Sequence, residues 1–176
     1  MNYLLTHQET ERLKFRLLVQ EDFGSWVPLF KAENVAKHLD LDASMSATEL
    51  CKVWFDKAFH RYENNLGGMN VLVDKETNRL VGQAGLLIQT IEDELRLEIG
   101  YSILPEFWNR GYAFEAAEKC KNFAFVNNLA DSLISMVHEE NIGSEKVALK
   151  NGMTFEKKIK PFNIFSIDKG NWKYLV

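Results

Sequence analysis

The order in which strand and helix patterns follow one another is the feature that most restricts the fold of this chain. Alternating or continuous apolar residues predict strands at Arg12–Val19, Met69–Asp74, Leu80–Gln89, Glu94–Ile103, Ser132–His138, Met153–Lys160 and Trp172–Val176. Apolar residues at helical spacing predict helical pieces within Asp22–Leu39 and longer helices at Ala47–Tyr62, Ala113–Phe125 and Asn141–Lys150. Antiparallel strands followed by a strand–helix–strand–helix–strand order predict an α+β (mixed α/β) domain.

Composition narrows the class of protein further. The chain has 176 residues and a net charge of -4, which predicts a single domain over residues 1–176 and disfavours a nucleic-acid-binding surface. Cys51 and Cys120 form no CxxC pair and are expected to be reduced core thiols. The histidines lack metal-ligand spacing, so no metal site is expected. With no secretory signal or membrane span in the sequence, we expect a cytoplasmic protein.

The turn Trp108–Ala113 (WNRGYA) precedes a predicted helix. After this turn, the start of the helix contains no Ser, Thr, Asp or Asn side chain that could accept the free amide hydrogens of the first helical turn. The backbone amides from Asn109 to Phe114 would therefore point outward from the positive end of the helix dipole, an arrangement that binds phosphate groups. Gly111 would let the backbone approach such a group closely, and Arg110 adds a cation. An ordinary turn capped by water remains the alternative.

A resemblance supports the phosphate-binding interpretation. The turn fills the acetyl-CoA motif Q/R-x-x-G-x-G/A of the GNAT superfamily of N-acetyltransferases, with Trp108 in place of Gln or Arg. The segment EIGYSILPEFWNRGYAFEA resembles the subgroup that acetylates ribosomal-protein α-amines, and the similarity covers nearly the whole chain. It implies a twisted, mostly antiparallel central sheet of six to seven strands with about four helices, in which the fourth and fifth strands splay apart.

The resemblance also implies residues that bind acetyl-CoA, the expected co-substrate. In such proteins the fourth strand pairs with the pantetheine arm, the turn binds the diphosphate, and an Asn of an N-x-x-S element hydrogen-bonds the arm. The implied contacts are Tyr101, Ser102, Ile103, Trp108, Asn109, Arg110, Gly111, Tyr112, Ala113, Phe114 and Asn141.

Three residues are candidates for the chemistry. Glu98, an acid inside a central strand, is the first candidate for the general base, and an ion pair with Arg96 or a neighbouring strand is its alternative. His138 is a second candidate for the base, or a satisfied histidine at a strand end. Many GNAT enzymes carry a tyrosine acid where this chain has Ala148, and Ser144 is the implied substitute.

The resulting hypothesis is an N-acetyltransferase that moves acetyl from acetyl-CoA to a primary amine by direct attack in a ternary complex. A protein N-terminal α-amine is the leading acceptor. Small amines (an amino acid, a polyamine or an aminoglycoside) and a non-catalytic acyl-CoA-binding module remain alternatives. A monomer or homodimer is expected, with no nucleic-acid or membrane partner. Acceptor specificity is expected around Trp26, Phe30, His38, Trp54 and Phe162–Trp172.

Overall fold

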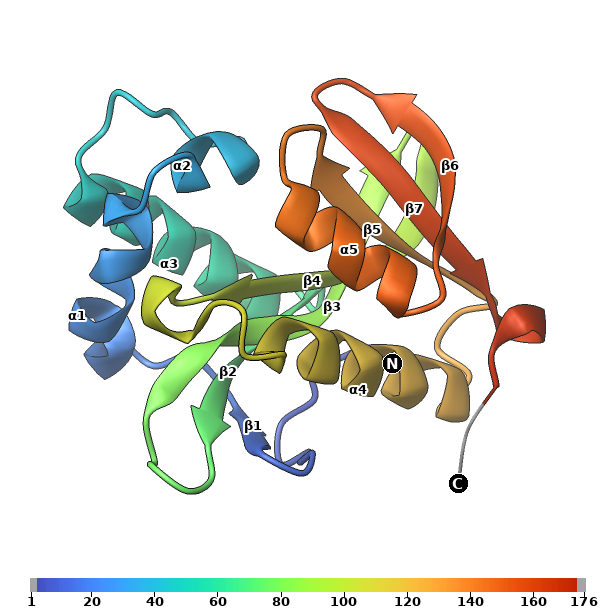
Figure 1. Ribbon diagram of the computed structural model, residues 1–176, viewed down its shortest axis with the longest axis horizontal. Helices are drawn as coiled ribbons and strands as arrows, with labels where there is room; N and C mark the ends of the chain where they lie inside the picture. Colours follow the sequence, from blue (N-terminus) through green and yellow to red (C-terminus); the bar gives the residue numbers. More distant parts are fainter. Residues whose placement is uncertain (1–2, 174–176) are drawn as a thin grey trace.

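One continuous sheet forms the centre of the protein. The computed structural model describes residues 3–173, and within them the sheet has seven strands in the order β1-β2-β3-β4-β5-β7-β6 (Figure 1). The strands are β1 (Leu13–Arg16), β2 (Gly67–Asp74), β3 (Leu80–Ile91), β4 (Glu94–Ile103), β5 (Ser132–His138), β6 (Thr154–Ile159) and β7 (Phe162–Asp168). This arrangement confirms the mixed α/β class and the mostly antiparallel sheet.

The exception to antiparallel pairing lies between β4 and β5. These strands are parallel because a helical crossover joins them, and they pair only at Leu97↔Leu133 and Glu98↔Ile134. Where backbone pairing stops, the Ser135 hydroxyl donates to the Ile99 carbonyl oxygen at 3.0 Å. Beyond that contact the two strands diverge, which confirms the expected splay.

Five α-helices flank the sheet in the described part of the chain. They are α1 (Phe23–Trp26), α2 (Val35–His38), α3 (Ala47–Glu63), α4 (Tyr112–Val126) and α5 (Ile142–Lys150). A capping box opens α3: the Ser46 hydroxyl accepts the Glu49 amide at 3.3 Å, and the Glu49 carboxylate accepts the Ser46 amide at 2.8 Å. The described chain has five α-helices where about four were expected, because the region before α3 contains two helices, α1 and α2, of a single turn each.

The two faces of the sheet are covered by different helices. Arg61 and Trp54 of α3 hydrogen-bond the side chains of Gln89 and Gln83, which share one face of β3. Helix α4 packs against β3 and β4 from the other face, and α5 lies beside it (Figure 1). Small side chains of α4, among them Ala116, Ala117 and Cys120, are buried there, as the helical spacing predicted.

The C-terminal region differs from the sequence prediction. β7 was not expected as a strand, although it pairs along its whole length with β5. Adjacent buried residues Ile164 and Phe165 interrupt its alternation, because Ile164 packs in a small cluster with Ile91 and Ile134 while Phe165 packs in the main core. The strand expected at Trp172–Val176 is wrong for Trp172 and Lys173, and its remainder lies outside the described residues. Trp172 packs on α4 instead, with its indole donating to the Asn122 side chain at 2.9 Å.

Candidate functional site

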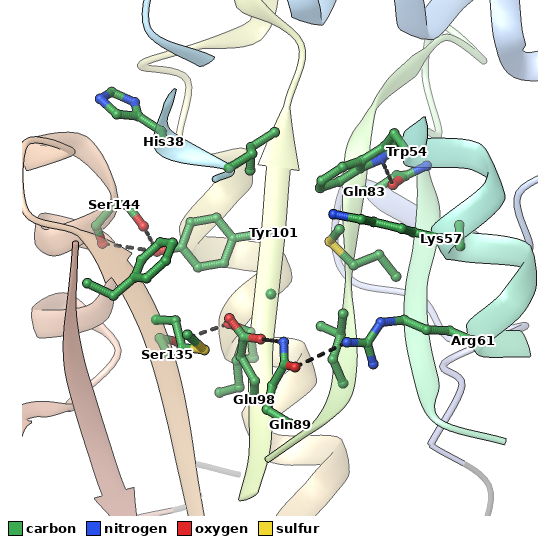
Figure 2. Close-up of a pocket in the computed structure, with 18 residues that line it drawn as sticks. His38, Trp54, Lys57, Arg61, Gln83, Gln89, Glu98, Tyr101, Ser135 and Ser144 are labelled. Carbon is green, nitrogen blue, oxygen red and sulfur yellow. Dashed lines mark hydrogen bonds between the residues drawn. The ribbon is translucent and has the colours of Figure 1, made fainter. Parts of the chain in front are cut away.

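A cavity of about 240 Å³ opens where β4 and β5 separate. Helix α3 and the segment around His38 form one wall, and β4, β5 and the start of α5 form the other. Because the sheet is interrupted at this point, side chains that alternate to opposite faces of β4 reach the same space. Glu98 and Tyr101 are such a pair, and both line the pocket drawn in Figure 2.

Glu98 is the carboxylate of this cavity and is only 9% exposed. The Gln89 side-chain amide donates to it at 2.6 Å, and the Gln89 oxygen in turn accepts from Arg61 at 3.2 Å (Figure 2). Burial raises the pKa of Glu98, while the hydrogen bonds from Gln89 and the Met136 backbone and the charge of Arg61 act in the opposite direction. A carboxyl group with a raised pKa at a cavity wall is suited to accept a proton near neutral pH.

The alternative ion pair between Glu98 and Arg96 is not formed. Arg96 makes a bidentate contact with Glu156 of β6, at 3.1 and 3.0 Å. Both terminal nitrogen atoms of Arg96 therefore bind Glu156. The oxygen atoms of Glu98 remain available to Gln89, the Met136 backbone and the cavity.

Tyr101 is a side chain whose role the sequence analysis missed. Its hydroxyl lies 2.8 Å from the Ser144 hydroxyl and donates to the Ser144 carbonyl oxygen at 2.9 Å. Burial raises the pKa of Tyr101 to about 12, so the phenol stays protonated at neutral pH. The resemblance implies only a backbone role for Tyr101, because the family's tyrosine acid corresponds to Ala148 of α5, which is buried. The contact joins residues 43 positions apart, and no local spacing reveals it.

Asn141 and Ser144 together open α5. The Asn141 side-chain oxygen accepts the Ser144 amide at 3.0 Å, as an N-cap does. This contact leaves the Asn141 side-chain nitrogen as the group that can hydrogen-bond a ligand, and it fixes Ser144 against Tyr101.

The structure places His138 apart from Glu98. His138 is buried at the end of β5, outside the cavity lining, and its Nδ1 accepts the Glu140 amide at 3.2 Å. Its ring packs between His38 and Phe162, with centroid distances of 5.3 and 5.9 Å. These contacts favour the structural alternative for His138. His38 does line the cavity, and burial followed by the proximity of His138 lowers its pKa.

The start of α4 has the geometry that the phosphate-binding interpretation needs. Gly111 is the N-cap residue with φ 81° and supplies no side-chain cap, and Asn109 also has a positive φ of 60°. The first hydrogen bond of the helix runs from the Glu115 amide to the Gly111 carbonyl. Within residues 3–173, the amides from Asn109 to Phe114 have no hydrogen-bond acceptor. This row of free donors fits a diphosphate.

Neighbouring side chains hold that turn in place. The Tyr112 hydroxyl donates to Asp74 at 2.8 Å, and the Arg12 guanidinium pairs with Glu115 at 2.6 Å and donates to the Arg110 carbonyl at 3.0 Å. The Trp108 indole turns back and donates to the Ile103 carbonyl at 2.7 Å. The free amides are thus presented by a fixed backbone.

The edge of β4 that faces the gap offers further backbone groups. Ile99 directs its carbonyl toward β5, so Tyr101 and Ile103, two and four residues on, direct their backbone groups the same way. Ser102 pairs instead with Gln83 of β3. The Tyr101 backbone at the open edge fits an extended arm with amide groups, such as pantetheine, so the residues present suit acetyl-CoA.

Residues 3–173 contain neither a candidate metal site nor a candidate membrane span. No group of three or more His, Cys, Asp or Glu side chains in that range could hold a metal ion. None of the helices found there is both long and apolar enough to cross a membrane.

Sequence comparisons link the chain to known proteins. Residues 12–154 match the family model described as acetyltransferase (GNAT) domain. The chain is 25% identical over 171 residues to the uncharacterized N-acetyltransferase YoaA of Bacillus subtilis, covering 92% of this chain and 96% of that one. It is 36% identical over 90 residues to the uncharacterized protein YkkB of the same organism, a match that spans only 51% of this chain and 52% of YkkB.

Solved structures share the fold at low sequence identity. An acetyltransferase from Agrobacterium tumefaciens superimposes with a TM-score of 0.77 and 21% identity, covering 95% and 96% of the two chains. RimL, a ribosomal L7/L12 α-N-protein acetyltransferase in complex with coenzyme A, gives 0.72 and 14%, covering 92% and 97%. A spermidine N-acetyltransferase from Vibrio cholerae in complex with CoA and spermine gives 0.69 and 17%, covering 92% and 98%.

Proposed function

The chain belongs to the GNAT acetyltransferase family and is an acetyl-CoA-dependent N-acetyltransferase, and we propose that it acetylates a primary amine by direct attack in the cavity between β4 and β5. The observation that carries this proposal is the meeting of Glu98 with the Tyr101–Ser144 hydroxyl pair in one cavity. The first group can take a proton from an amine, and the second can donate a hydrogen bond to a leaving sulfur atom.

Acetyl-CoA supplies the acetyl group as a thioester when it is bound. The amides from Asn109 to Phe114 bind its diphosphate, and the open edge of β4 at Tyr101 aligns its arm. Glu98 accepts the proton that the amine loses, directly or through water. A C–N bond to the acetyl carbon forms, the C–S bond breaks, and the Tyr101–Ser144 pair donates a hydrogen bond to the departing thiolate.

The acceptor group that enters this cavity is small. At about 240 Å³ the space falls below the range of roughly 300–1,000 Å³ found for drug-sized ligands. A protein N-terminal α-amine fits this limit when only its first residue enters, as the likeness to RimL suggests. A small free amine fits it equally well.

Thermal unfolding with and without acetyl-CoA, followed by thiol release against amines and peptides, tests the proposal. A ligand present at about a hundred times its dissociation constant should stabilise the protein by about 2.7 kcal/mol. Stabilisation with thiol release supports the transferase. Stabilisation without release on any acceptor favours an acyl-CoA-binding module, and no stabilisation removes the proposed diphosphate site.

The same assay can isolate the hydroxyl pair. We expect Tyr101→Phe to lower kcat by about ten- to a hundredfold, the size expected for one hydrogen bond to a charged group, while the stabilisation by acetyl-CoA stays unchanged. Tyr62→Phe is the matched control, since burial also raises the pKa of Tyr62 to about 12 but its hydroxyl donates to the Met69 carbonyl outside the reaction. Equal kcat in the two variants would contradict the role of Tyr101.

A further inference from the structure

The charges that line the cavity are unequally distributed between its two walls. Glu98 is the carboxylate of the lining, and it lies on β4. The opposite wall carries Lys57 and Arg61, which are four residues apart on α3 and therefore share one helix face. His38 adds no fixed charge near neutral pH, since its pKa is lowered. The cavity thus has one anionic group facing two cations.

The two cations differ in the hydrogen bonds that they already make to other residues of the protein. Arg61 donates to the carbonyl oxygens of Leu66 and Ile88, at 3.2 and 3.1 Å, and to Gln89 at 3.2 Å. It therefore holds Gln89 in position for Glu98 and offers little to a ligand. Lys57 has no ion pair or hydrogen bond to any residue in the described range 3–173, and its side chain extends from α3 into the cavity (Figure 2).

From this distribution we propose that the acceptor amine carries a carboxylate, as a free amino acid does, and that Lys57 binds this carboxylate. The proposal rests on the proposed function and selects among the acceptors it leaves open. If its amine faces Glu98 and its carboxylate faces Lys57, such an acceptor places a group of opposite charge against each wall of the cavity. A polyamine would place additional positive charge beside Lys57 and Arg61, which is unfavourable in a partly enclosed space. A protein N-terminus would present a neutral peptide carbonyl to Lys57.

The rest of the lining sets limits on the acceptor's side chain. Leu39, Ala58, Leu87 and Met136 also line the cavity. An aliphatic amino acid would bury its side chain against them, with its charged groups toward Glu98 and Lys57. Leucine is therefore a suitable probe.

Three acceptors that share one side chain isolate the carboxylate: L-leucine, L-leucinamide and 3-methylbutylamine. Leucinamide also stands for a protein N-terminus, because its carbonyl is uncharged. We expect kcat/KM to be at least about tenfold higher for leucine than for the other two, since only leucine offers Lys57 a charge-assisted hydrogen bond. The Lys57→Met variant should lose that preference through a raised KM for leucine, with little change for leucinamide.

Lys52→Met is the matched control, because Lys52 is also an exposed lysine of α3 but does not line the cavity. It should keep the preference of the unchanged protein. Lys57→Glu should reverse the preference, so that kcat/KM becomes higher for 3-methylbutylamine and spermidine than for leucine. Equal kcat/KM for leucine and leucinamide in the unchanged protein, or an unchanged preference in Lys57→Met, overturns the proposal.

A binding measurement separates this inference from the proposed function. Calorimetry of N-acetylleucine and N-acetylleucinamide against the protein with CoA requires no turnover. Tighter binding of the carboxylate form that is lost in Lys57→Met supports the inference even if no acceptor is acetylated. Equal binding of the two, or no binding of either, overturns it. Failure of thiol release on every acceptor, with Lys57-dependent binding retained, would count against the transferase alone.

Discussion

Glu98 shows how one buried carboxyl group links pH to activity. Its pKa is raised above the ordinary value of 4.5, chiefly by burial. Below the raised pKa the carboxyl is protonated and cannot accept a proton from the amine. We therefore expect kcat/KM to rise with pH through a limb that lies above 4.5, and Glu98→Gln to lower turnover by about a hundredfold or more and to remove this limb.

The stability of the protein should show the same titration with the opposite sign. Because the folded state binds the Glu98 proton more tightly than the unfolded state does, the free energy of unfolding contributed by this group falls as pH rises from 4.5 through the raised pKa. Urea unfolding across this range should show the decrease in the unchanged protein and its absence in Glu98→Gln. A pH-rate profile with the same acidic limb in both proteins would exclude Glu98 as the base.

Individual candidate residues could be named from the sequence where a local pattern points to them. An acid inside a strand made Glu98 the first candidate for the base, and the N-x-x-S element of the family resemblance drew attention to Asn141 and Ser144, which the structure shows to be joined as the cap of α5. The Gln89–Arg61 support for Glu98 and the Tyr101–Ser144 contact depend on the pairing of distant segments. Strand alternation places Tyr101 and Glu98 on opposite faces of β4, and only the separation of β4 from β5 brings both to one cavity.

At the scale of elements, the start of α4 combines a strained backbone with free donors. Gly111 has φ 81°, a conformation that side chains disfavour, although a Cβ there would meet only the Arg12 guanidinium at 3.5 Å. The cost of Gly111→Ala should therefore come from the backbone, about 1 kcal/mol of unfolding free energy. A Gly111→Glu change adds a negative charge at the amides proposed to bind the diphosphate.

Gly152 provides a matched control for this element. It follows α5 with φ 84°, and a Cβ there would meet the Ile167 side chain at 3.5 Å, so its backbone strain is comparable. We expect Gly152→Glu and Gly111→Glu to lower the melting temperature of the free protein similarly. Only Gly111→Glu should abolish the shift caused by acetyl-CoA. Retained acetyl-CoA binding by calorimetry in Gly111→Glu would refute the diphosphate assignment.

Elements with strong local signals were predictable, and elements defined by their neighbours were not. The capping box of Ser46 and Glu49 fixed the start of α3, because both of its hydrogen bonds are local. β7 could not be recognised from its pattern, because Ile164 and Phe165 are adjacent in sequence and pack in two different apolar clusters, which removes the alternation of apolar and polar residues. Trp172 was expected to begin a strand, but its ring packs on α4 instead, 5.5 Å from the Phe125 ring.

At the scale of the whole molecule, the sheet is joined at one end and open at the other. On β4, backbone pairing with β5 is confined to Leu97 and Glu98. Arg96, the residue before Leu97, forms an ion pair with Glu156 on β6, a strand that is separated from β4 by β5 and β7. This pair connects the two halves of the sheet at the closed end. The side chains are only 16% and 28% exposed, so the contact is better shielded than the surface pairs.

The Arg96–Glu156 pair should therefore contribute to stability without affecting chemistry. Its hydrogen bond with Arg96 is the main cause that lowers the pKa of Glu156, so its contribution is present above the ordinary value of 4.5 and is lost as pH falls through the lowered pKa. We expect Glu156→Gln to reduce the free energy of unfolding near neutral pH by about 1 kcal/mol, and by much less in acid.

Glu106→Gln is the control for this prediction. It removes an ion pair with Arg79 in which both side chains are more than half exposed, so it should have almost no effect on the free energy of unfolding. Urea unfolding at both pH values measures the difference, and thiol release at a temperature well below unfolding should stay unchanged in both variants. Equal losses in the two variants would mean that the closed end of the sheet is held by backbone pairing and apolar packing alone.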